Sequence, residues 1–261
     1  MAYALFLDIL GTSARLCSLP DDHDFEDDHV LGSGYRSAHY SFREAVLLAG
    51  KYAPPGSFIA LFSDCVYLVQ RDPLLFSRAV NSLLYHVRHA HIPFRGGIGY
   101  GNFHFEQTSH IASSVLNINE SSFFGSSLVF AHRAESCGLK GMRVFVHRSA
   151  ASTLSELYDG LPVFPQRITL SEDDPRPPTF GATTIVIPEP TIDDVQHEVC
   201  YLGDEDVEVE MRLVDIVAAA SGVTDSTEIH YAETRKLLER VNVRRNSLEI
   251  SWRQAASRYG F

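Results

Sequence analysis

The stretch YALFLDILGTSA (residues 3–14) has a counterpart in FIALFSDCVYLV (residues 58–69). Each is a run of aromatic, β-branched and other apolar residues interrupted by one carboxylate, Asp8 in the first and Asp64 in the second. Such runs are typical of strands buried in a sheet, where a charge is not expected. Because an unpaired buried carboxylate is costly to desolvate, two of them on adjacent strands suit a hard divalent cation such as Mg²⁺ or Mn²⁺.

Composition and charge restrict the class of protein. The 261 residues are 45% hydrophobic, which is typical of a globular chain, and the formal net charge is −11. Binding a nucleic-acid polymer requires a basic face, so such a partner is not expected, whereas a small anionic substrate is compatible with local cations. The four cysteines lack CxxC spacing, which argues against structural zinc and a disulfide framework. With neither a signal peptide nor an apolar run of spanning length, we expect a soluble, cytoplasmic protein.

Hydrophobic periodicity and turn residues give the expected order of elements up to residue 158. The order is β-α-β-β-α-β-β-α-β-α, which predicts an α+β sheet with its helices on one face. Ser63 and Asp64 form the expected tip of a hairpin, and Ser149 is placed to cap a helix. The expected strands are 3–9, 58–62, 65–69, a pair within 94–105, and 142–146; the expected helices are 35–52, 73–90, one that follows a loop within 122–137, and 149–158.

The signal weakens after residue 160. Residues 165–190 are rich in proline, threonine and charge, with one short β run at 183–187, and helices are expected at 213–220 and 232–241. We therefore expect a catalytic-type domain over residues 1–160. Residues 161–261 are expected to complete that domain and to add a C-terminal α/β extension.

Four blocks of the chain resemble the class III nucleotidyl cyclases, in that family's order. They are FLDILGTSA (residues 6–14), FSDCVYLV (62–69), FRGGIGYGNF (94–103) and FFGSSLVFAHRAES (123–136). Any one block is a weak signal, but four in order, each with the expected charged residue, are more specific. The resemblance implies the family's ferredoxin-like palm sheet with helices packed on it.

The resemblance also implies roles for individual residues. Asp8 and Asp64 would ligate two Mg²⁺ or Mn²⁺ ions, with the Ile9 carbonyl as a further ligand. Arg95 would pair with the triphosphate, its alternative being a salt bridge at the strand end. Arg133 would neutralise charge on the α-phosphate from the other subunit of a head-to-tail homodimer, while Glu135 is expected to be a structural partner. The backbone amides expected to cradle phosphate oxygens are those of Leu10, Gly11, Thr12 and Ser13.

Three positions depart from the family's purine cyclases. Ala60 stands where a base-reading lysine is expected, and Ser122 where its partner aspartate is expected. These two residues cannot reproduce the paired polar readout of adenine, so an adenylate cyclase is disfavoured, and they are the first candidates to line the base site. Val129 replaces the ribose-orienting asparagine, four residues before Arg133.

A cyclase-like sequence that keeps the two metal aspartates but lacks the pair of residues that reads adenine resembles the pyrimidine cyclases of bacterial Pycsar antiphage defence. These make cyclic UMP or cyclic CMP as a second messenger for a separate cyclic-nucleotide-binding effector. We expect UTP rather than CTP as the substrate because of the members of that family, and not because of any residue in this sequence. Two alternatives stay open: a catalytically dead cyclase-like module that binds nucleotide or a partner, which Val129 favours, and a dinucleotide cyclase, which lacks support because no GGDEF-type turn is present.

Overall fold

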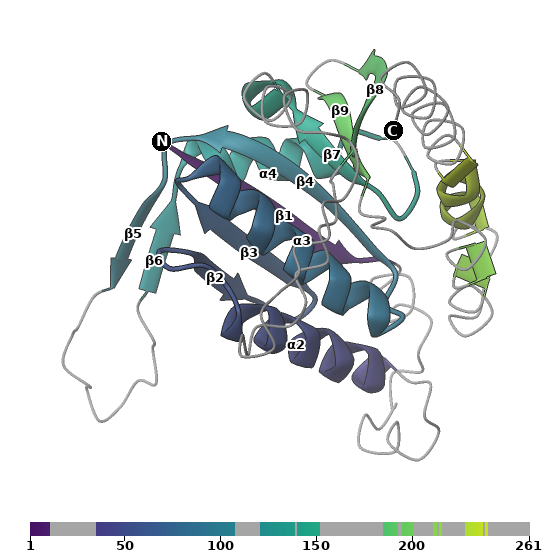
Figure 1. Cartoon of the computed structure of the whole chain (residues 1–261), viewed down its shortest axis with the longest axis horizontal. Helices are drawn as coiled ribbons and strands as arrows, with labels where there is room; N and C mark the ends of the chain where they lie inside the picture. Colours follow the sequence, from purple (N-terminus) through teal and green to yellow (C-terminus); the bar gives the residue numbers. More distant parts are fainter. Residues whose placement is uncertain are drawn as a thin grey trace, which may run out of the picture.

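The computed structural model describes residues 1–10, 35–107, 121–138, 140–151, 185–192 and 195–200, with parts of two later helical segments at 211–215 and 228–239. Seven strands form one sheet in the order β2-β3-β1-β4-β7-β9-β8 (Figure 1). β1 lies between antiparallel β3 and β4, and β7 pairs with β4 in parallel. The strands are β1 Ala2–Ile9, β2 Phe58–Leu61, β3 Cys65–Gln70, β4 Phe94–Gly101, β7 Val144–His147, β8 Ile185–Ile192 and β9 Val195–Cys200.

The first part of the chain has the β-α-β-β-α-β arrangement of a ferredoxin-like unit, which confirms the α+β prediction. Its helices are α2 (Tyr35–Lys51), between β1 and β2, and α3 (Pro73–His89), between β3 and β4. The expected hairpin is present, because the Phe62 N–H donates to the Cys65 carbonyl at 2.8 Å and Ser63 and Asp64 form the tip. α3 begins where the Asp72 carboxylate accepts the Leu75 N–H at 2.9 Å.

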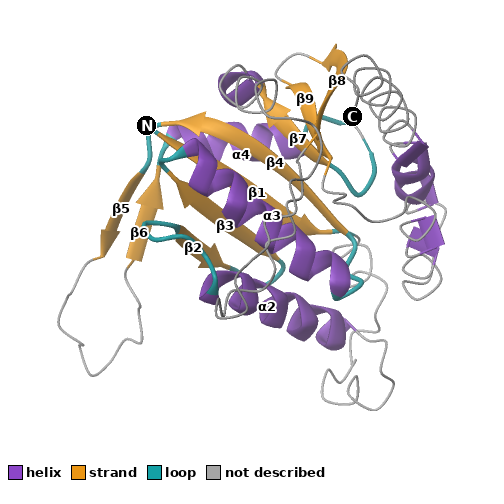
Figure 2. Cartoon of the chain, viewed as in Figure 1, coloured by secondary structure: helices purple, strands orange, loops and turns teal. Residues whose placement is uncertain are grey.

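The helices cover both faces of the sheet, so the expectation of one covered face was wrong (Figure 2). Alternate residues of β1 point to opposite faces. Leu5 and Leu7 share the larger core with side chains of α2 and α3, whereas Ala4 and Phe6 pack with Leu128 and others of α4 (Ser126–Glu135). Both faces of β1 are therefore buried, which explains its continuous apolar run.

Close approach of α4 to β4 depends on glycine. A Cβ on Gly99 would lie 2.5 Å from the Ala131 nitrogen and 2.6 Å from the Ser127 carbonyl oxygen of α4. A Cβ on Gly97 or on Gly101 would likewise clash with atoms of this helix. These glycines of FRGGIGYGNF let α4 lie directly on the strand.

The two strands expected within 94–105 exist but do not pair with each other. β5 (His104–Gln107) instead forms a separate two-stranded hairpin with β6 (Ser121–Phe124), a segment expected to be a loop. The expected Ser149 cap was also wrong: His147 Nδ1 accepts the Ser149 N–H at 3.1 Å, while Ser149 Oγ accepts the Tyr100 N–H at 3.0 Å. Local sequence patterns did not identify β6 as the partner of β5, nor Tyr100 and His147 as the partners of Ser149.

Residues beyond 160 contribute to the same sheet and core. β9 pairs with β7, and β8 with β9. Tyr231 and Leu238, from the last described helical segment, are 5% and 1% exposed and belong to the larger core. The described parts of the chain beyond residue 210 thus contribute side chains to the larger core.

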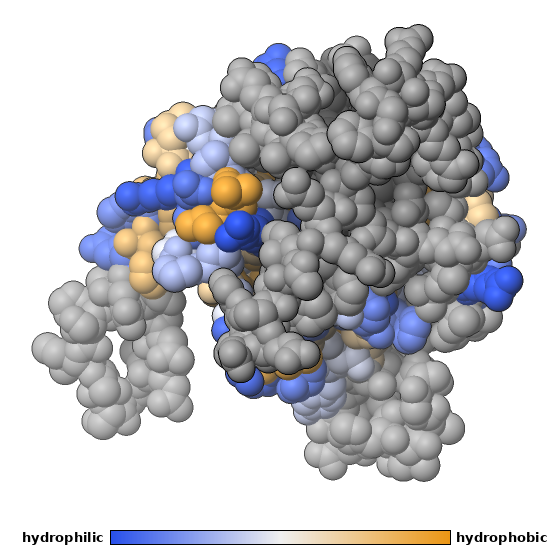
Figure 3. Space-filling view, in the orientation of Figure 1, coloured by the Kyte–Doolittle hydropathy of each residue, from blue (hydrophilic) through white to orange (hydrophobic). Residues whose placement is uncertain are grey.

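Figure 3 shows the side of the molecule on which α3 lies. The described residues on this side are largely polar, with an apolar patch over the beginning of α3, where Leu74 is 46% exposed. None of the helices in the described part of the chain has the length and hydropathy to cross a membrane.

Candidate functional site

The two carboxylates singled out in the sequence lie together at one end of the sheet. Asp8 is opposite Cys65 in the pairing of β1 with β3, one residue from Asp64. The Ile9 N–H donates to the Asp64 carbonyl at 3.0 Å, which fixes the hairpin tip beside the end of β1. Asp64 Oδ1 also accepts the Ser63 hydroxyl at 3.0 Å. The predicted adjacency of the two acid-bearing strands is confirmed.

Asp8 is in an environment that opposes its ionisation. Burial raises the pKa of the Asp8 carboxyl to about 7, and the nearby Asp64 and Glu135 carboxylates add to this effect. A hydrogen bond from the Ile9 backbone and the charge of Arg95 act in the opposite direction but do not offset it. A bound cation would stabilise the ionised form, so the local charge fits a metal ion.

The donor set suits Mg²⁺ or Mn²⁺ bound together with a substrate. Among the described residues, no group of three or more His, Cys, Asp or Glu side chains could hold a metal ion by itself. Mg²⁺ is commonly held by one or two carboxylates together with substrate phosphates and water. Asp8 and Asp64 supply this number of carboxylates, and Ile9 lies directly next to Asp8 at the end of β1.

Neighbouring groups that could transfer protons are held in their neutral forms. Burial raises the pKa of the Cys65 thiol to about 11, with further contributions from Asp8 and Asp64. Burial also raises the pKa of Tyr67, with contributions from Cys65 and Glu135. Cys65 is therefore a poor nucleophile at neutral pH.

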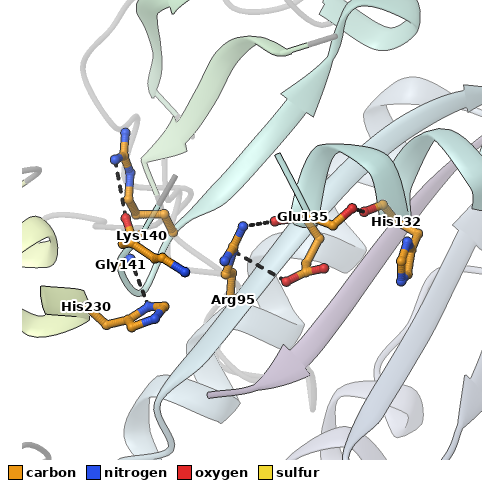
Figure 4. Close-up of polar contacts among 8 residues, drawn as sticks. Arg95, His132, Glu135, Lys140, Gly141 and His230 are labelled. Atoms are coloured by element: carbon orange, nitrogen blue, oxygen red, sulfur yellow. Dashed lines mark hydrogen bonds and ion pairs between the residues drawn. The ribbon is translucent and has the colours of Figure 1, made fainter. Parts of the chain in front are cut away.

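Arg95 lies on β4 directly opposite Asp8, at a buried position that is 7% exposed. Its guanidinium donates to the Glu135 carbonyl at the end of α4, and its Nε lies 3.4 Å from Glu135 Oε1 (Figure 4). The guanidinium carbon also lies 5.7 Å from the centre of the Phe145 ring. The salt bridge considered as an alternative for Arg95 is thus present, and Glu135 is its partner.

Arg133 and Val129 lie one turn apart on the outer face of α4. Both side chains are exposed, whereas Leu128, Ala131 and Ala134 of the same helix are buried against the sheet. Val129 is 51% exposed. Because positions four apart share a helix face, both side chains point away from their own sheet.

Ala60 and Ser122 are not brought together. Ala60 pairs with Tyr67, on the same sheet face as Asp8. Phe123, not Ser122, is the residue of β6 that packs on this region, with its ring centre 5.8 Å from that of Tyr67. Ser122 is exposed, as expected when successive residues of a strand alternate. The surroundings of Ala60 are therefore aromatic: Phe58, Phe62, Tyr67 and Phe123.

The four amides expected to bind phosphate are only partly described. Gly11, Thr12 and Ser13 lie outside the described residues. The Leu10 N–H donates to the Pro93 carbonyl at 2.9 Å, so this amide is already used between the end of β1 and the start of β4. The expectation that the Leu10 amide binds phosphate was wrong, because the pairing of β1 with β4 extends one residue beyond the strand expected from the sequence.

Two residues near the carboxylates were not given a site role from the sequence. Glu135 acts on the Asp8 pKa as well as binding Arg95, because α4 ends above the junction of β1 and β4. Phe123 lies on a segment without a strand signal.

No protein-family model and no curated protein matches the sequence. Among solved structures, the chain is similar to the guanylyl cyclase domain of the RhoGC fusion protein from Blastocladiella emersonii, with a TM-score of 0.43, 13% identity and coverage of 78% of this chain and 96% of that one. For the guanylate cyclase domain of RhGC from Catenaria anguillulae in complex with GTP, the TM-score is 0.42, the identity 12% and the coverage 76% and 95%. Adenylate cyclases from Trypanosoma brucei give 0.43, 12%, 78% and 90%. Likeness at this level carries no conclusion about what the chain binds.

Proposed function

We propose that this chain is a nucleotidyl cyclase that converts a nucleoside triphosphate into a 3′,5′-cyclic monophosphate and pyrophosphate. The ribose 3′-oxygen forms a bond to the α-phosphorus, the bond from the α-phosphorus to the bridging oxygen breaks, and the hydroxyl proton passes to solvent. The juxtaposition of Asp8 and Asp64 at the end of adjacent strands carries the proposal. A partly buried acidic pair of this kind suits metal-bound phosphate better than a neutral substrate.

We propose separate roles for these residues in binding the metal ions and in binding the phosphates. Asp8 and Asp64, with the Ile9 carbonyl, would hold two Mg²⁺ or Mn²⁺ ions, which when bound polarise the phosphate oxygens and activate the attacking hydroxyl. Arg95, which lies opposite Asp8 on β4, would neutralise phosphate charge on the same sheet face. Glu135 holds the Arg95 side chain in one orientation, which reduces the entropy lost when it binds.

We further propose a homodimer in which Arg133 acts on the nucleotide bound by the other subunit. The exposure of Arg133 on the outer face of α4 supports this arrangement. Phe62 and Phe105 are 46% and 42% exposed, and both lie beside Phe123: Phe62 packs on its ring, and Phe105 is its cross-strand partner on β5. Exposed apolar side chains that gather in this way are characteristic of protein interfaces.

For the base, we propose a pyrimidine, with UTP preferred over CTP, and cyclic UMP as a second messenger for a separate effector in antiviral defence. The sequence resemblance to the Pycsar cyclases supports the pathway. Ala60 offers no hydrogen-bond donor, and the rings of Phe62, Tyr67 and Phe123 offer stacking surfaces beside it. Residues 1–160 would form the catalytic unit, completed by the later strands.

Incubation of the purified protein with each of the four ribonucleoside triphosphates and Mn²⁺ tests the activity. We expect a cyclic monophosphate and pyrophosphate from UTP, detected by chromatography and mass spectrometry, and no product from the Asp8→Asn variant. Product from CTP alone would correct the base preference and keep the reaction. Absence of cyclic product from all four nucleotides would overturn the proposal.

The second candidate is a catalytically silent module that binds a nucleoside triphosphate and signals through a change of conformation. Val129 favours it, because this exposed apolar side chain cannot orient a ribose hydroxyl from its place one turn before Arg133. Calorimetric binding of UTP with Mn²⁺, without any product after prolonged incubation, would select this candidate. A Val129→Asn variant that gains turnover would show that the missing amide is the reason.

A further inference from the structure

A group of basic residues lies beyond Arg95, at the turn that connects α4 to β7. Lys140 and Gly141 form this turn, and His230 approaches it from the last described helical segment (Figure 4). Lys140 is exposed, and no acidic partner for its ammonium is recorded among the described side chains. In the view of Figure 4 its side chain extends toward the side on which the Arg95 guanidinium lies.

Electrostatics places these groups in one region. The pKa of His230 is lowered, first by burial and then by the positive charges of Lys140 and Arg95. Arg95 is already paired with Glu135, whereas Lys140 has no such partner among the described carboxylates. An anion beside Lys140 would therefore meet a cation whose charge is not yet balanced.

The turn that carries Lys140 is held on two sides. The Arg143 guanidinium donates to the Lys140 carbonyl at 3.4 Å, and the Gly141 N–H donates to His230 Nδ1 at 3.1 Å. The next residue, Met142, donates its N–H to Thr234 Oγ1 at 2.7 Å. Gly141 has a φ of 118°, a conformation that favours glycine. Three successive residues, from Lys140 to Met142, are thus each held by a hydrogen bond to the rest of the fold.

The turn lies at the end of the sheet that carries the carboxylates. β4 begins with Phe94 and Arg95 opposite the end of β1 at Asp8. β7 runs parallel to β4, with Val144 beside Gly96, so the residues just before Val144 are at this same end. Lys140 therefore lies in the turn that precedes the strand next to β4, at the end of the sheet where Asp8 and Arg95 face each other.

Resting on the proposed function, we infer that Lys140 is a second cation of the triphosphate site: its ammonium and the Arg95 guanidinium bind the terminal phosphate, and His230 positions the turn that presents it. The ligand class is a linear polyphosphate chain, bound by its metal complex at Asp8 and Asp64 and by its far end at Lys140. His230 touches no substrate and is a positioning residue. Its neutral imidazole accepts the Gly141 N–H, which a protonated ring cannot do.

Tripolyphosphate, which carries no base and cannot cyclise, tests the inference by titration calorimetry in the presence of Mg²⁺. We expect Lys140→Met to weaken binding about tenfold, because one partly solvent-exposed charge-assisted contact is lost. Lys140→Arg should restore most of the affinity. The matched control is Lys51→Met, which removes an exposed lysine at the end of α2. Affinity within twofold of the wild type in Lys140→Met, or an equal loss in Lys51→Met, would overturn the assignment.

The role of His230 is tested with two variants. Asn presents a side-chain oxygen close to the place of Nδ1, so His230→Asn should keep tripolyphosphate affinity, while His230→Leu should lower it. Hydrogen exchange at the Gly141 and Met142 amides is the second readout, and it should rise only in His230→Leu. Equal affinities in the two variants would refute the positioning role.

Failure of the inference and failure of the proposed function give different results. If tripolyphosphate binding depends on Lys140 but no nucleotide is cyclised, the subsite stands and the cyclase assignment fails. If a nucleotide is cyclised and Lys140→Met leaves both KM and kcat unchanged, the cyclase assignment stands and the subsite fails.

Discussion

Asp8 is a carboxyl group that the fold holds near its point of ionisation. Its pKa is raised from 3.8 to about 7 by burial, Asp64 and Glu135, so the metal-free folded protein binds a proton more tightly than the unfolded chain does. The stability that this proton contributes is complete below pH 3.8 and is lost as the pH rises toward 7. At pH 8 the ionised carboxylate therefore opposes folding unless a cation is bound.

From this we predict that Asp8→Asn stabilises the metal-free protein at pH 8, by on the order of 1 kcal/mol after allowance for partial exposure. Urea unfolding in the presence of a chelator, at pH 5 and pH 8, measures the difference. The gain should be larger at pH 8, and Mn²⁺ should stabilise the wild type but not the variant. The control Glu44→Gln removes an exposed carboxylate of α2 and should leave stability unchanged. A wild type more stable than Asp8→Asn in chelator would contradict the cause given for the pKa.

The sequence was sufficient to predict that Asp8 and Asp64 lie close together. Each interrupts an apolar run, and a buried carboxylate needs a counter-charge, which two adjacent strands can share. It was not sufficient for Glu135 or Phe123. Glu135 reaches Asp8 only because α4 ends above the junction of β1 and β4, and Phe123 lies on a strand whose partner is β5. Both positions depend on contacts between segments distant in the chain, which local periodicity does not encode.

At the level of elements, α4 is the part whose placement sequence patterns missed. Helices α2 and α3 show clear apolar stripes that match their core face. α4 instead packs on a strand of glycines, so the strand face that receives it carries no hydrophobic signal. For this reason the hydrophobic pattern of the sequence did not predict that the second face of the sheet is covered.

We predict that Gly99→Ala displaces α4 and destabilises the protein by about 1–3 kcal/mol, as expected for overpacking against atoms that cannot move independently. The added Cβ would meet the Ala131 nitrogen at 2.5 Å and the Ser127 carbonyl oxygen at 2.6 Å. Thermal or urea unfolding gives the loss, and the change in α4 should also lower turnover, since this helix carries Arg133 and Glu135.

Gly50→Ala is the matched control for this substitution. Gly50 lies in the last turn of α2, and its added Cβ would lie 3.6 Å from Ile59 Cδ1, an ordinary contact. Because alanine favours the helix over glycine, stability should stay constant or rise by up to about 1 kcal/mol. Equal destabilisation by both substitutions would mean that the α4 contact is not the cause.

At the scale of the whole molecule, one chain holds the carboxylates and presents Arg133 outward, so a complete site is expected only between two subunits. In the proposed two-fold dimer the same patch of each subunit would face the other, and each subunit would supply Arg133 to its partner's nucleotide. Asp8→Asn and Arg133→Ala homodimers should each be nearly inactive, the second mainly through kcat, because Arg133 is proposed to act on charge that develops in the transition state.

Mixing the two variants under conditions that exchange subunits should recover about a quarter of wild-type activity, since half of the dimers are mixed and each has one intact site. Sedimentation shows whether the proteins are dimers, and a mixture of two Asp8→Asn preparations is the control without recovery. If Arg133 acted within its own chain, every site in the mixture would lack one group and no activity would return. A monomeric yet fully active wild type would likewise contradict a shared site, and would require Arg133 to reach the nucleotide from the outer face of its own α4.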